Sequence, residues 1–331
     1  MKSRFQLLIL SCIVGLGSGC DKPFSPKEDF QERYVLQCFV QGDYEKNLES
    51  VTALLARTYD VEGFNPSANT NDPAIAGAEV TLTFDGKPYN LQEAFRPAPE
   101  GFQYGTRQRY YSRLVTAPPP ESKVGIIAKL PNGQTLSAQT IIPRGRAFTS
   151  SYEFAAGLTT RLNLQPGKPN WIVGWENYDD TEVHLFYPRL TILYTKMEGG
   201  VERTGSVPVP VRYVSGGGGP IPVYPSYSTN KSCSFEFYAI DSAMAQISAG
   251  DPDKHSYGLH TARLEVIEYD LPLSKYFSSV NGSLDQFSIR TDQLVFSNVG
   301  GGIGILASFI VHKVQFDFDI RYVLLYGYRY R

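Results

Sequence analysis

Short runs of alternating apolar and polar residues recur along this chain, and turn residues separate them. In residues 78–84 every second side chain is apolar, which is the period of a strand with one buried face. Asp85 and Gly86 follow, and this dipeptide between alternating runs is typical of a tight hairpin turn. A partner strand is expected from Pro88 onward. A chain built from such runs is predicted to be all-β.

Residues 33–145 contain enough of these runs for one N-terminal β-sandwich domain of the immunoglobulin-like kind. Residues 33–41 read as an apolar strand. A second hairpin is predicted over residues 124–142, with its turn at 131–133. Residues 50–59 fit either a strand or one face of a helix, and the pattern leaves both open.

Residues 150–331 are predicted to form a second, C-terminal β-rich domain. Trp171 and Trp175 lie at even spacing, which places them on one face of a strand. Further strands are expected at 158–164 and 188–195. A Trp-bearing strand followed by a Tyr-rich one resembles the start of a fibronectin type III-like sandwich.

Two short helical inserts are predicted in this second domain. The first covers residues 241–248 with Asp241 as its N-cap, and the second covers residues 271–279 with Asp270 as its N-cap. Pro272 stands in the first turn of the second helix, where a missing N–H costs nothing.

Two more strands are predicted near these helices. Residues 233–240 read as an apolar strand, and the clearest alternation of the chain closes the sequence. The side chains predicted on one face of that last strand are Val314, Phe316, Phe318, Ile320 and Tyr322.

Composition agrees with a strand-rich fold and excludes some partners. Aromatic residues make up 13% of the chain, with 22 Tyr and 19 Phe, and 30 Gly and 22 Pro interrupt them. Such a mixture favours strands and turns over helices. The formal net charge is −2, whereas nucleic-acid binding calls for a strong basic excess. Nucleic acid is therefore not an expected partner.

Residues 1–19 have the layout of a secretory signal peptide. Lys2 and Arg4 form a short basic start, residues 5–16 form an apolar run, and small residues follow. The run is shorter than the roughly 20 apolar residues that span a bilayer. The chain is therefore predicted to be exported.

Cys20 follows this segment and is predicted to be the lipid anchor. Residues 16–20 resemble a bacterial lipobox, in which the cysteine receives acyl chains such as palmitate and becomes the new N-terminus; Gly17 departs from the pattern. A plain signal peptide with an incidental cysteine is the alternative. Residues 20–32 are polar, contain two prolines and read as a flexible tether.

Two further cysteines remain after the predicted cleavage, Cys38 and Cys233. They lie in different predicted domains, so a disulfide between them requires close contact of those domains. Two buried free thiols are the favoured interpretation, and the sequence leaves the pairing open.

No catalytic or metal-binding residues are predicted. Gly216–Gly219 precede a proline and open no helix, which excludes a phosphate loop. The glycines at 300–304 lack the spacing of a dinucleotide-binding turn and predict a tight turn before a buried strand. The four histidines, His184, His255, His260 and His312, form no cluster with zinc-ligand spacing. We therefore expect a non-enzymatic protein without cofactors.

The candidate binding residues are aromatic. Tyr224 and Tyr227 stand in a Gly/Pro-rich loop over residues 215–227, where exposed rings can stack on a partner. Packing of these rings on the core or on proline is the alternative. A second aromatic group, in residues 104–111, contains Tyr104, Arg109, Tyr110 and Tyr111.

Three segments carry a resemblance to a known family. Residues 76–82 (AGAEVTL), 128–143 (AKLPNGQTLSAQTIIP) and 296–305 (FSNVGGGIGI), together with Cys20, resemble two-domain lipoproteins of Bacteroidota classed as a domain of unknown function. The chain departs from that pattern at 306–308. The family has no established catalytic residues, so none is carried over. Its members are often encoded beside TonB-dependent outer-membrane receptors, which implies an accessory role in uptake.

The sequence thus predicts an outer-membrane lipoprotein with two sandwich-like domains, acting as a binding or accessory component of the cell envelope. Its expected partners are the membrane, through Cys20, and a TonB-dependent receptor. A secreted carbohydrate-active enzyme and a structural or adhesion protein of the cell surface are the alternatives.

Overall fold

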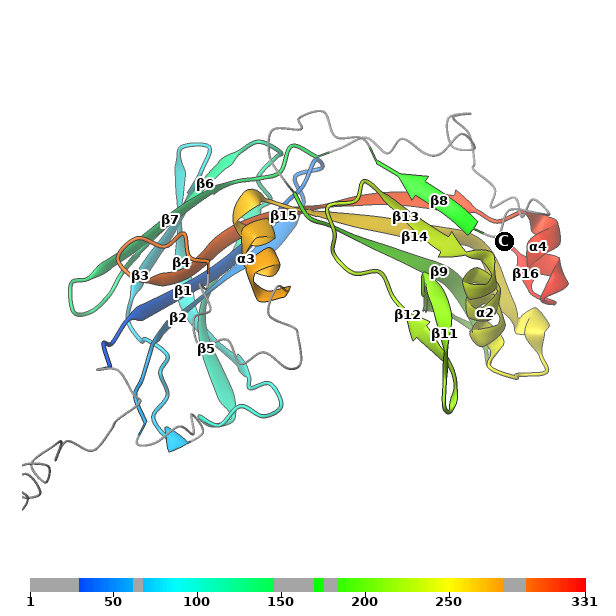
Figure 1. The fold of residues 1–331 in the computed structure, drawn as a ribbon, viewed down its shortest axis with the longest axis horizontal. Coiled ribbons are helices and arrows are strands. Elements are labelled where there is room, and N and C mark those ends of the chain that lie inside the picture. The colour runs from blue at the N-terminus through cyan, green and yellow to red at the C-terminus, as the bar shows by residue number, and fades with distance from the viewer. Residues whose placement is uncertain (1–29, 62–67, 146–169, 176–183, 282–295) are drawn as a thin grey trace, which may run out of the picture.

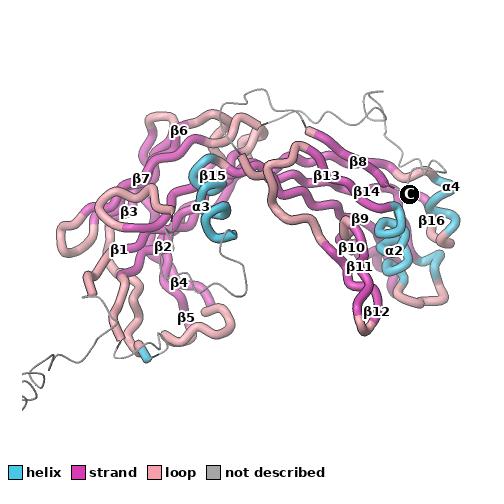
Figure 2. The backbone as a smooth tube through the Cα atoms, in the orientation of Figure 1, coloured by secondary structure: helices cyan, strands magenta, loops and turns pink. Residues whose placement is uncertain are grey.

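The structure is a computed structural model that describes residues 30–61, 68–145, 170–175, 184–281 and 296–331. Twelve of its described strands join in one sheet with the order β10-β9-β14-β15-β1-β2-β5-β4-β3-β6-β7, in which β16 also pairs with β14. The other four form two separate two-stranded sheets, β11 with β12 and β8 with β13. Figures 1 and 2 show two halves that together form an arch. The signal peptide, Cys20, most of the tether and the strand predicted at 158–164 lie outside the described residues.

The N-terminal half consists of seven strands. They are β1 (Tyr34–Gly42), β2 (Leu48–Arg57), β3 (Glu79–Phe84), β4 (Lys87–Pro97), β5 (Arg107–Thr116), β6 (Lys123–Lys129) and β7 (Thr135–Ile141). The ambiguous segment at 50–59 is thus a strand, because β2 pairs with both β1 and β5. Those two ladders satisfy its backbone groups on both edges.

The C-terminal half combines strands with the short helices. Its elements are β8 (Asn170–Gly174), β9 (Phe186–Glu198), β10 (Val201–Val209), β11 (Arg212–Gly216), β12 (Gly219–Val223), β13 (Ser232–Glu236), α2 (Phe237–Ser248), η2 (Lys254–Ser256), β14 (Tyr257–Tyr269), α3 (Leu271–Asn281), β15 (Ile303–Asp317), α4 (Ile320–Leu325) and β16 (Arg329–Tyr330). Strands dominate both halves, so the described chain is mostly β, in agreement with the predicted all-β class with short helical inserts.

One strand, β15, belongs to both halves of the sheet. Residues 303–310 pair in parallel with β1, and residues 309–317 pair antiparallel with β14. The domain boundary predicted between residues 145 and 150 stays a prediction. In space, residues 303–310 of β15 pair with β1 and so belong to the N-terminal part of the sheet. Figure 1 shows β15 running from one half into the other.

Strand β4 bends the N-terminal half of the sheet over itself. Its first part pairs with β3 and its second part pairs with β5. The apolar faces on either side of this bend meet in one buried cluster. That cluster includes Leu36, Val51, Leu82, Tyr111 and Ile126.

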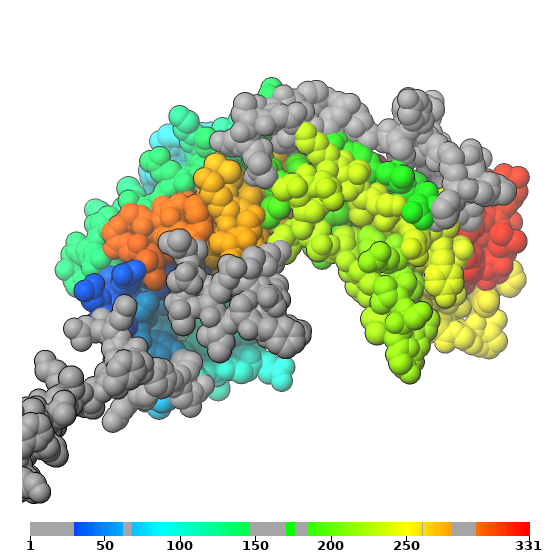
Figure 3. Space-filling model, viewed as in Figure 1, coloured from blue at the N-terminus to red at the C-terminus, as the bar shows by residue number. Residues whose placement is uncertain are grey.

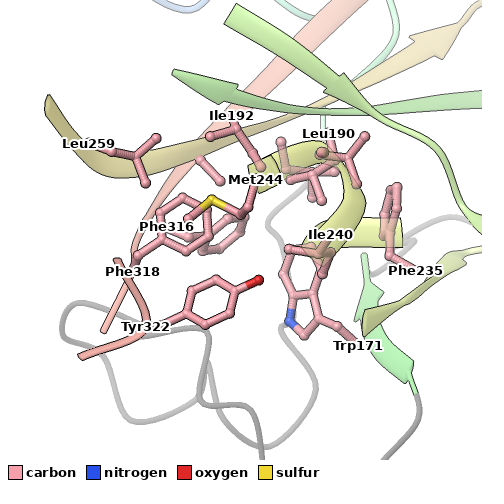
Figure 4. Packing of buried hydrophobic residues seen from close by; sticks show 14 of the residues in the cluster. Trp171, Leu190, Ile192, Phe235, Ile240, Met244, Leu259, Phe316, Phe318 and Tyr322 are labelled. Atoms are coloured by element: carbon pink, nitrogen blue, oxygen red, sulfur yellow. The ribbon is translucent and has the colours of Figure 1, made fainter. Parts of the chain in front are cut away.

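A second buried cluster lies in the C-terminal half. Trp171 and Trp175 are both buried, whereas Ile172 between them is 51% exposed, so the predicted one-sided strand is confirmed. The Trp171 ring lies edge-on to Phe316, with ring centroids 5.2 Å apart. Figure 4 shows this contact beside Met244 of α2.

Both predicted hairpins are present. β3 and β4 pair across Asp85 and Gly86, which have φ angles of 51° and 71°. Positive φ at both central residues is what the tightest hairpin turns require. β6 and β7 pair across the turn at 131–133.

The helix predicted over residues 241–248 is present and ends at Ser248 as predicted, but its predicted start is wrong. Residues 237–240 are helical and not part of a strand, and α2 begins after Glu236, so Asp241 lies inside the helix and not at its N-cap. The Asp241 carboxylate instead accepts hydrogen bonds from Tyr322 at 2.6 Å and Tyr326 at 2.9 Å. Burial of Ile240 and Met244 on one helix face explains the earlier start.

The last predicted strand ends early. β15 stops at Asp317, and residues 320–325 form α4. The Asp319 carboxylate accepts a hydrogen bond from the backbone amide of Arg321 at 2.8 Å, which caps the helix. Ile320 is consequently 47% exposed and not inward-facing.

The second predicted helix and its cap are confirmed. Asp270 precedes α3, and its carboxylate accepts a hydrogen bond from the backbone amide of Leu273 at 2.8 Å. The glycines at 300–304 form a turn that leads into β15, also as predicted.

Candidate interaction surface

The loop that carries Tyr224 begins as a projecting hairpin. β11 and β12 pair from Arg212 with Val223 to Gly216 with Gly219. Figure 1 shows this hairpin pointing away from the C-terminal half on the lower side of the arch. At its base the Tyr213 ring lies 5.8 Å from the Tyr238 ring of α2. The hairpin is therefore fixed to α2 and free at its turn.

Apolar side chains of this hairpin face solvent. Val214 is 39% exposed, Ile221 is 53% exposed and Tyr224 is 48% exposed. Arg212 is the one charged residue in the segment 212–224. A projecting segment with exposed apolar side chains and little charge is typical of a protein-binding element.

The two predicted binding tyrosines have different surroundings. Tyr224 is exposed, whereas Tyr227 is half-buried and its ring centroid lies 4.8 Å from that of Phe277 in α3. Tyr227 thus belongs to an aromatic group around α3. Tyr224 is the better placed of the two for contact with a partner, and the binding role of both stays a prediction.

The α3 aromatic group consists of Tyr227, Tyr269, Tyr276 and Phe277. The Phe277 ring lies 5.4 Å from Tyr269 and 5.7 Å from Tyr276, centroid to centroid. Burial raises the pKa of the Tyr269 phenol above its ordinary value. Tyr269 belongs to β14 and Phe277 to α3, so their ring contact links α3 to the sheet.

A buried carboxylate lies where the two halves meet. Asp270 is 2% exposed and accepts hydrogen bonds from Thr140 of β7, from the amide and hydroxyl of Ser308 of β15, and from Leu273 of α3. Burial raises the pKa of the Asp270 carboxyl even though these donors oppose the shift. The donors occupy both carboxylate oxygens, so Asp270 links β7, β15 and α3.

Two of the histidines make polar contacts, each with a different residue. His184 Nδ1 lies 2.8 Å from the backbone oxygen of Tyr269, and His312 Nε2 lies 3.4 Å from the buried carboxylate of Glu268. Within the described ranges, no group of three His, Cys, Asp or Glu residues could hold a metal ion. Nor does any described helix have the length and hydropathy to cross a membrane.

Cys38 and Cys233 are free thiols in the structure. Cys38 is buried in the N-terminal cluster, and Cys233 packs against the C-terminal cluster. Burial raises the pKa of each thiol to about 12. The favoured interpretation of two unpaired thiols thus agrees with the structure.

The second aromatic group of the sequence is spread over the β4–β5 hairpin. Tyr111 is buried and its hydroxyl donates to the Ile75 carbonyl at 2.9 Å. Tyr104 lies in the connecting loop, and its hydroxyl donates to the Tyr59 hydroxyl at 2.9 Å. Arg109 and Tyr110 are adjacent in β5 and therefore face opposite sides of the hairpin.

The sequence did not single out three neighbouring residues of this hairpin, Phe95, Arg96 and Arg107. Pairing of β4 with β5 from Gln92 to Pro97 brings Arg107 over the Phe95 ring on one face of the hairpin and places Arg96 on the other face. The available signal was the spacing of the arginines at 107, 109 and 113, which places three positive charges on one strand face.

Comparison with known proteins adds no family to these observations. No protein-family model matches the chain. No curated protein is significantly similar to it. The function is therefore argued from the residues themselves.

Proposed function

We propose that the protein is a lipid-anchored binding component of the bacterial outer membrane. The β11–β12 hairpin carries the binding role, because its exposed Val214, Ile221 and Tyr224 project from a fixed base with one charge nearby. Residues 1–20 supply the anchor, with Cys20 as the acylated residue. Two or three acyl chains hold a protein on a bilayer firmly, whereas one holds it weakly.

We also propose that each half is a β-sandwich of the immunoglobulin or fibronectin III kind. In the N-terminal half the bend in β4 turns two parts of the sheet toward each other over one apolar cluster. In the C-terminal half the buried cluster draws on β8 and β13 as well as on β9 and β14. A rigid scaffold of this kind suits a protein that presents loops to a partner.

The partner that we propose is a TonB-dependent receptor in the same membrane. The resemblance of residues 128–143 and 296–305 to lipoproteins encoded beside such receptors motivates this choice. The exposed apolar residues of β11–β12 support a protein partner, because apolar and aromatic side chains are enriched in interface centres.

Changing Cys20 tests the anchor. Cys20→Ala is expected to leave an unprocessed precursor or to release the protein from the membrane fraction. The control is Cys12→Ala, a change inside the apolar run over residues 5–16, which is expected to leave processing unchanged. Fractionation and the electrophoretic mobility of the precursor measure both outcomes. Membrane retention and normal processing of Cys20→Ala would contradict the proposed anchor.

Site-specific crosslinking tests the binding role. A photo-crosslinking residue in place of Ile221 or Tyr224 is expected to capture an outer-membrane receptor in living cells. The same residue in place of Leu325, which is 82% exposed on α4, serves as the matched control. Equal capture at all three positions, or capture of no receptor at 221 and 224, would refute binding through this hairpin.

A further inference from the structure

The β4–β5 hairpin is basic in a chain that is slightly acidic overall. Residues 87–116 contain five basic residues against two acidic ones, a formal charge of +3, whereas the whole chain has −2. The acidic residues are Glu93 and Glu100, and Glu93 forms an ion pair with Arg109. In the described part of the chain, no carboxylate pairs with Arg96, Arg107 or Arg113. Their positive charges are free to meet an anionic partner.

Guanidinium groups lie on both faces of this hairpin near its free end. On one face Arg107 and Arg109 lie over the Phe95 ring, 5.1 and 4.8 Å from its centroid. On the other face Arg96 lies 5.6 Å from the centroid of the Tyr110 ring. A site that binds one protein domain would carry its charges on one face of the hairpin. Positive charges on both faces are instead expected where the end of a hairpin binds an extended anionic layer, because such a layer can contact both faces.

Aromatic rings occupy the loop at this free end. The Tyr104 ring lies 5.4 Å from Phe102 and 6.5 Å from Tyr59, both edge-on. Each of the three is partly exposed. Tyrosine combined with arginine is typical of segments that lie at the interface between a membrane and water.

The same end of the molecule receives the chain from its proposed tether. The Arg33 amide donates to the Thr58 hydroxyl at 2.8 Å, and the Thr58 amide donates to the Arg33 carbonyl at 2.8 Å. The next residue, Tyr59, contacts Tyr104 of the hairpin loop. A tether attached at Cys20 and ending near Arg33 would thus hold this loop close to the bilayer.

We propose that the free end of the β4–β5 hairpin binds the phosphate-bearing headgroups of an anionic membrane, with Arg96 and Arg107 as the principal contacts. This inference rests on the proposed lipid anchor for its biological setting, since the anchor supplies the membrane. The hairpin would fix the orientation of the N-terminal half on the surface. In Figure 1 the hairpin and β11–β12 lie on the same side of the arch, so the second hairpin would also approach the membrane. Figure 3 shows the hollow between them.

Vesicle binding without the lipid tests this contact separately from the anchor. The protein used comprises residues 21–331, which contain every described residue and lack Cys20. Its partitioning onto phosphatidylglycerol-containing vesicles is compared with that onto pure phosphatidylcholine vesicles by co-sedimentation. Because each basic residue near an anionic surface contributes appreciably to binding, Arg96→Gln with Arg107→Gln is expected to lower partitioning about 30-fold. Binding is also expected to weaken as salt rises.

A matched control removes two exposed arginines elsewhere. Arg203→Gln with Arg329→Gln changes the net charge equally at β10 and β16, and is expected to preserve binding. The proposal would be overturned if both double variants lost binding equally, or if the protein bound neutral vesicles as well as anionic ones. Binding to soluble polyglutamate and not to vesicles would also overturn it. Failure of the Cys20 experiment leaves this result unaffected, because the protein tested carries no acyl chain.

Discussion

The carboxylate of Asp270 accepts a 2.5 Å hydrogen bond from the backbone amide of Ser308. Asp270 caps α3, and Ser308 lies in the part of β15 that pairs with β1. The same carboxylate accepts from Thr140 of β7. One buried side chain therefore joins three elements that are distant in sequence at the meeting point of the two halves.

Removing this carboxylate is expected to destabilise the protein. Asp270→Ala leaves the amides of Leu273 and Ser308 buried without an acceptor, and each such group costs about 1–3 kcal/mol. The free energy of unfolding in urea should fall by about 3 kcal/mol. Asp253→Ala, at an exposed position, should change it little. A loss below about 1 kcal/mol for Asp270→Ala would show that the junction does not depend on this residue.

Because the pKa of Asp270 is raised in the folded protein, its contribution to the free energy of unfolding is expected to decrease as pH rises. An unfolded aspartate has a pKa of about 3.9, and burial raises the folded value. A raised folded pKa contributes stability that is complete below the unfolded pKa and is lost as pH rises through the folded pKa. Asp270→Asn has a side chain of nearly the same shape that does not titrate, so this variant serves as the reference.

Urea unfolding of both proteins between about pH 3 and pH 7 measures this effect. The native protein should lose stability relative to Asp270→Asn as pH rises above about 4. A gain over the same interval would mean that the four donors outweigh burial and lower the pKa of Asp270.

A methyl group at Gly304 is expected to disrupt the parallel β1–β15 ladder. Gly304 pairs with Leu36 and has a φ angle of 123°, and a Cβ there would overlap the Leu36 carbonyl. Gly304→Ala should lower the free energy of unfolding by about 2–4 kcal/mol. Gly217→Ala, where a Cβ meets no neighbour within 4 Å, is the control. Equal effects of the two changes would contradict the observed pairing.

The two thiols of residues 21–331 should be unreactive in the folded protein. A pKa of about 12 leaves Cys38 and Cys233 almost entirely protonated at neutral pH, and the thiolate is the reactive form. A chromogenic disulfide reagent should detect both thiols in denaturant and neither in the native protein. Failure to detect them in denaturant without a reductant would indicate a disulfide.

Local sequence patterns correctly predicted the elements that are determined by residues close together in the chain. Asp85 and Gly86 fixed the β3–β4 turn because both adopt positive φ. Asp270 and Pro272 located α3 through the capping and first-turn preferences of helices. Alternation in residues 170–175 identified the buried face of Trp171 and Trp175.

Distant contacts decided what the local patterns missed. Residues 237–240 read as a strand, but packing of Ile240 on the C-terminal cluster makes them helical. The division of β15 between β1 and β14 depends on a parallel pairing between segments far apart in the chain, which a single sequence does not reveal. The placement of Arg96 and Arg107 on opposite faces of one hairpin end likewise follows only once β4 and β5 pair.

The intact mass of the protein purified from the membranes of its own host tests the central claim most directly. The account predicts a mature chain that begins at Cys20 and carries the added mass of a diacylglyceryl group and an amide-linked acyl chain. A mature chain that begins at another residue, or one that begins at Cys20 with no added mass, would contradict it.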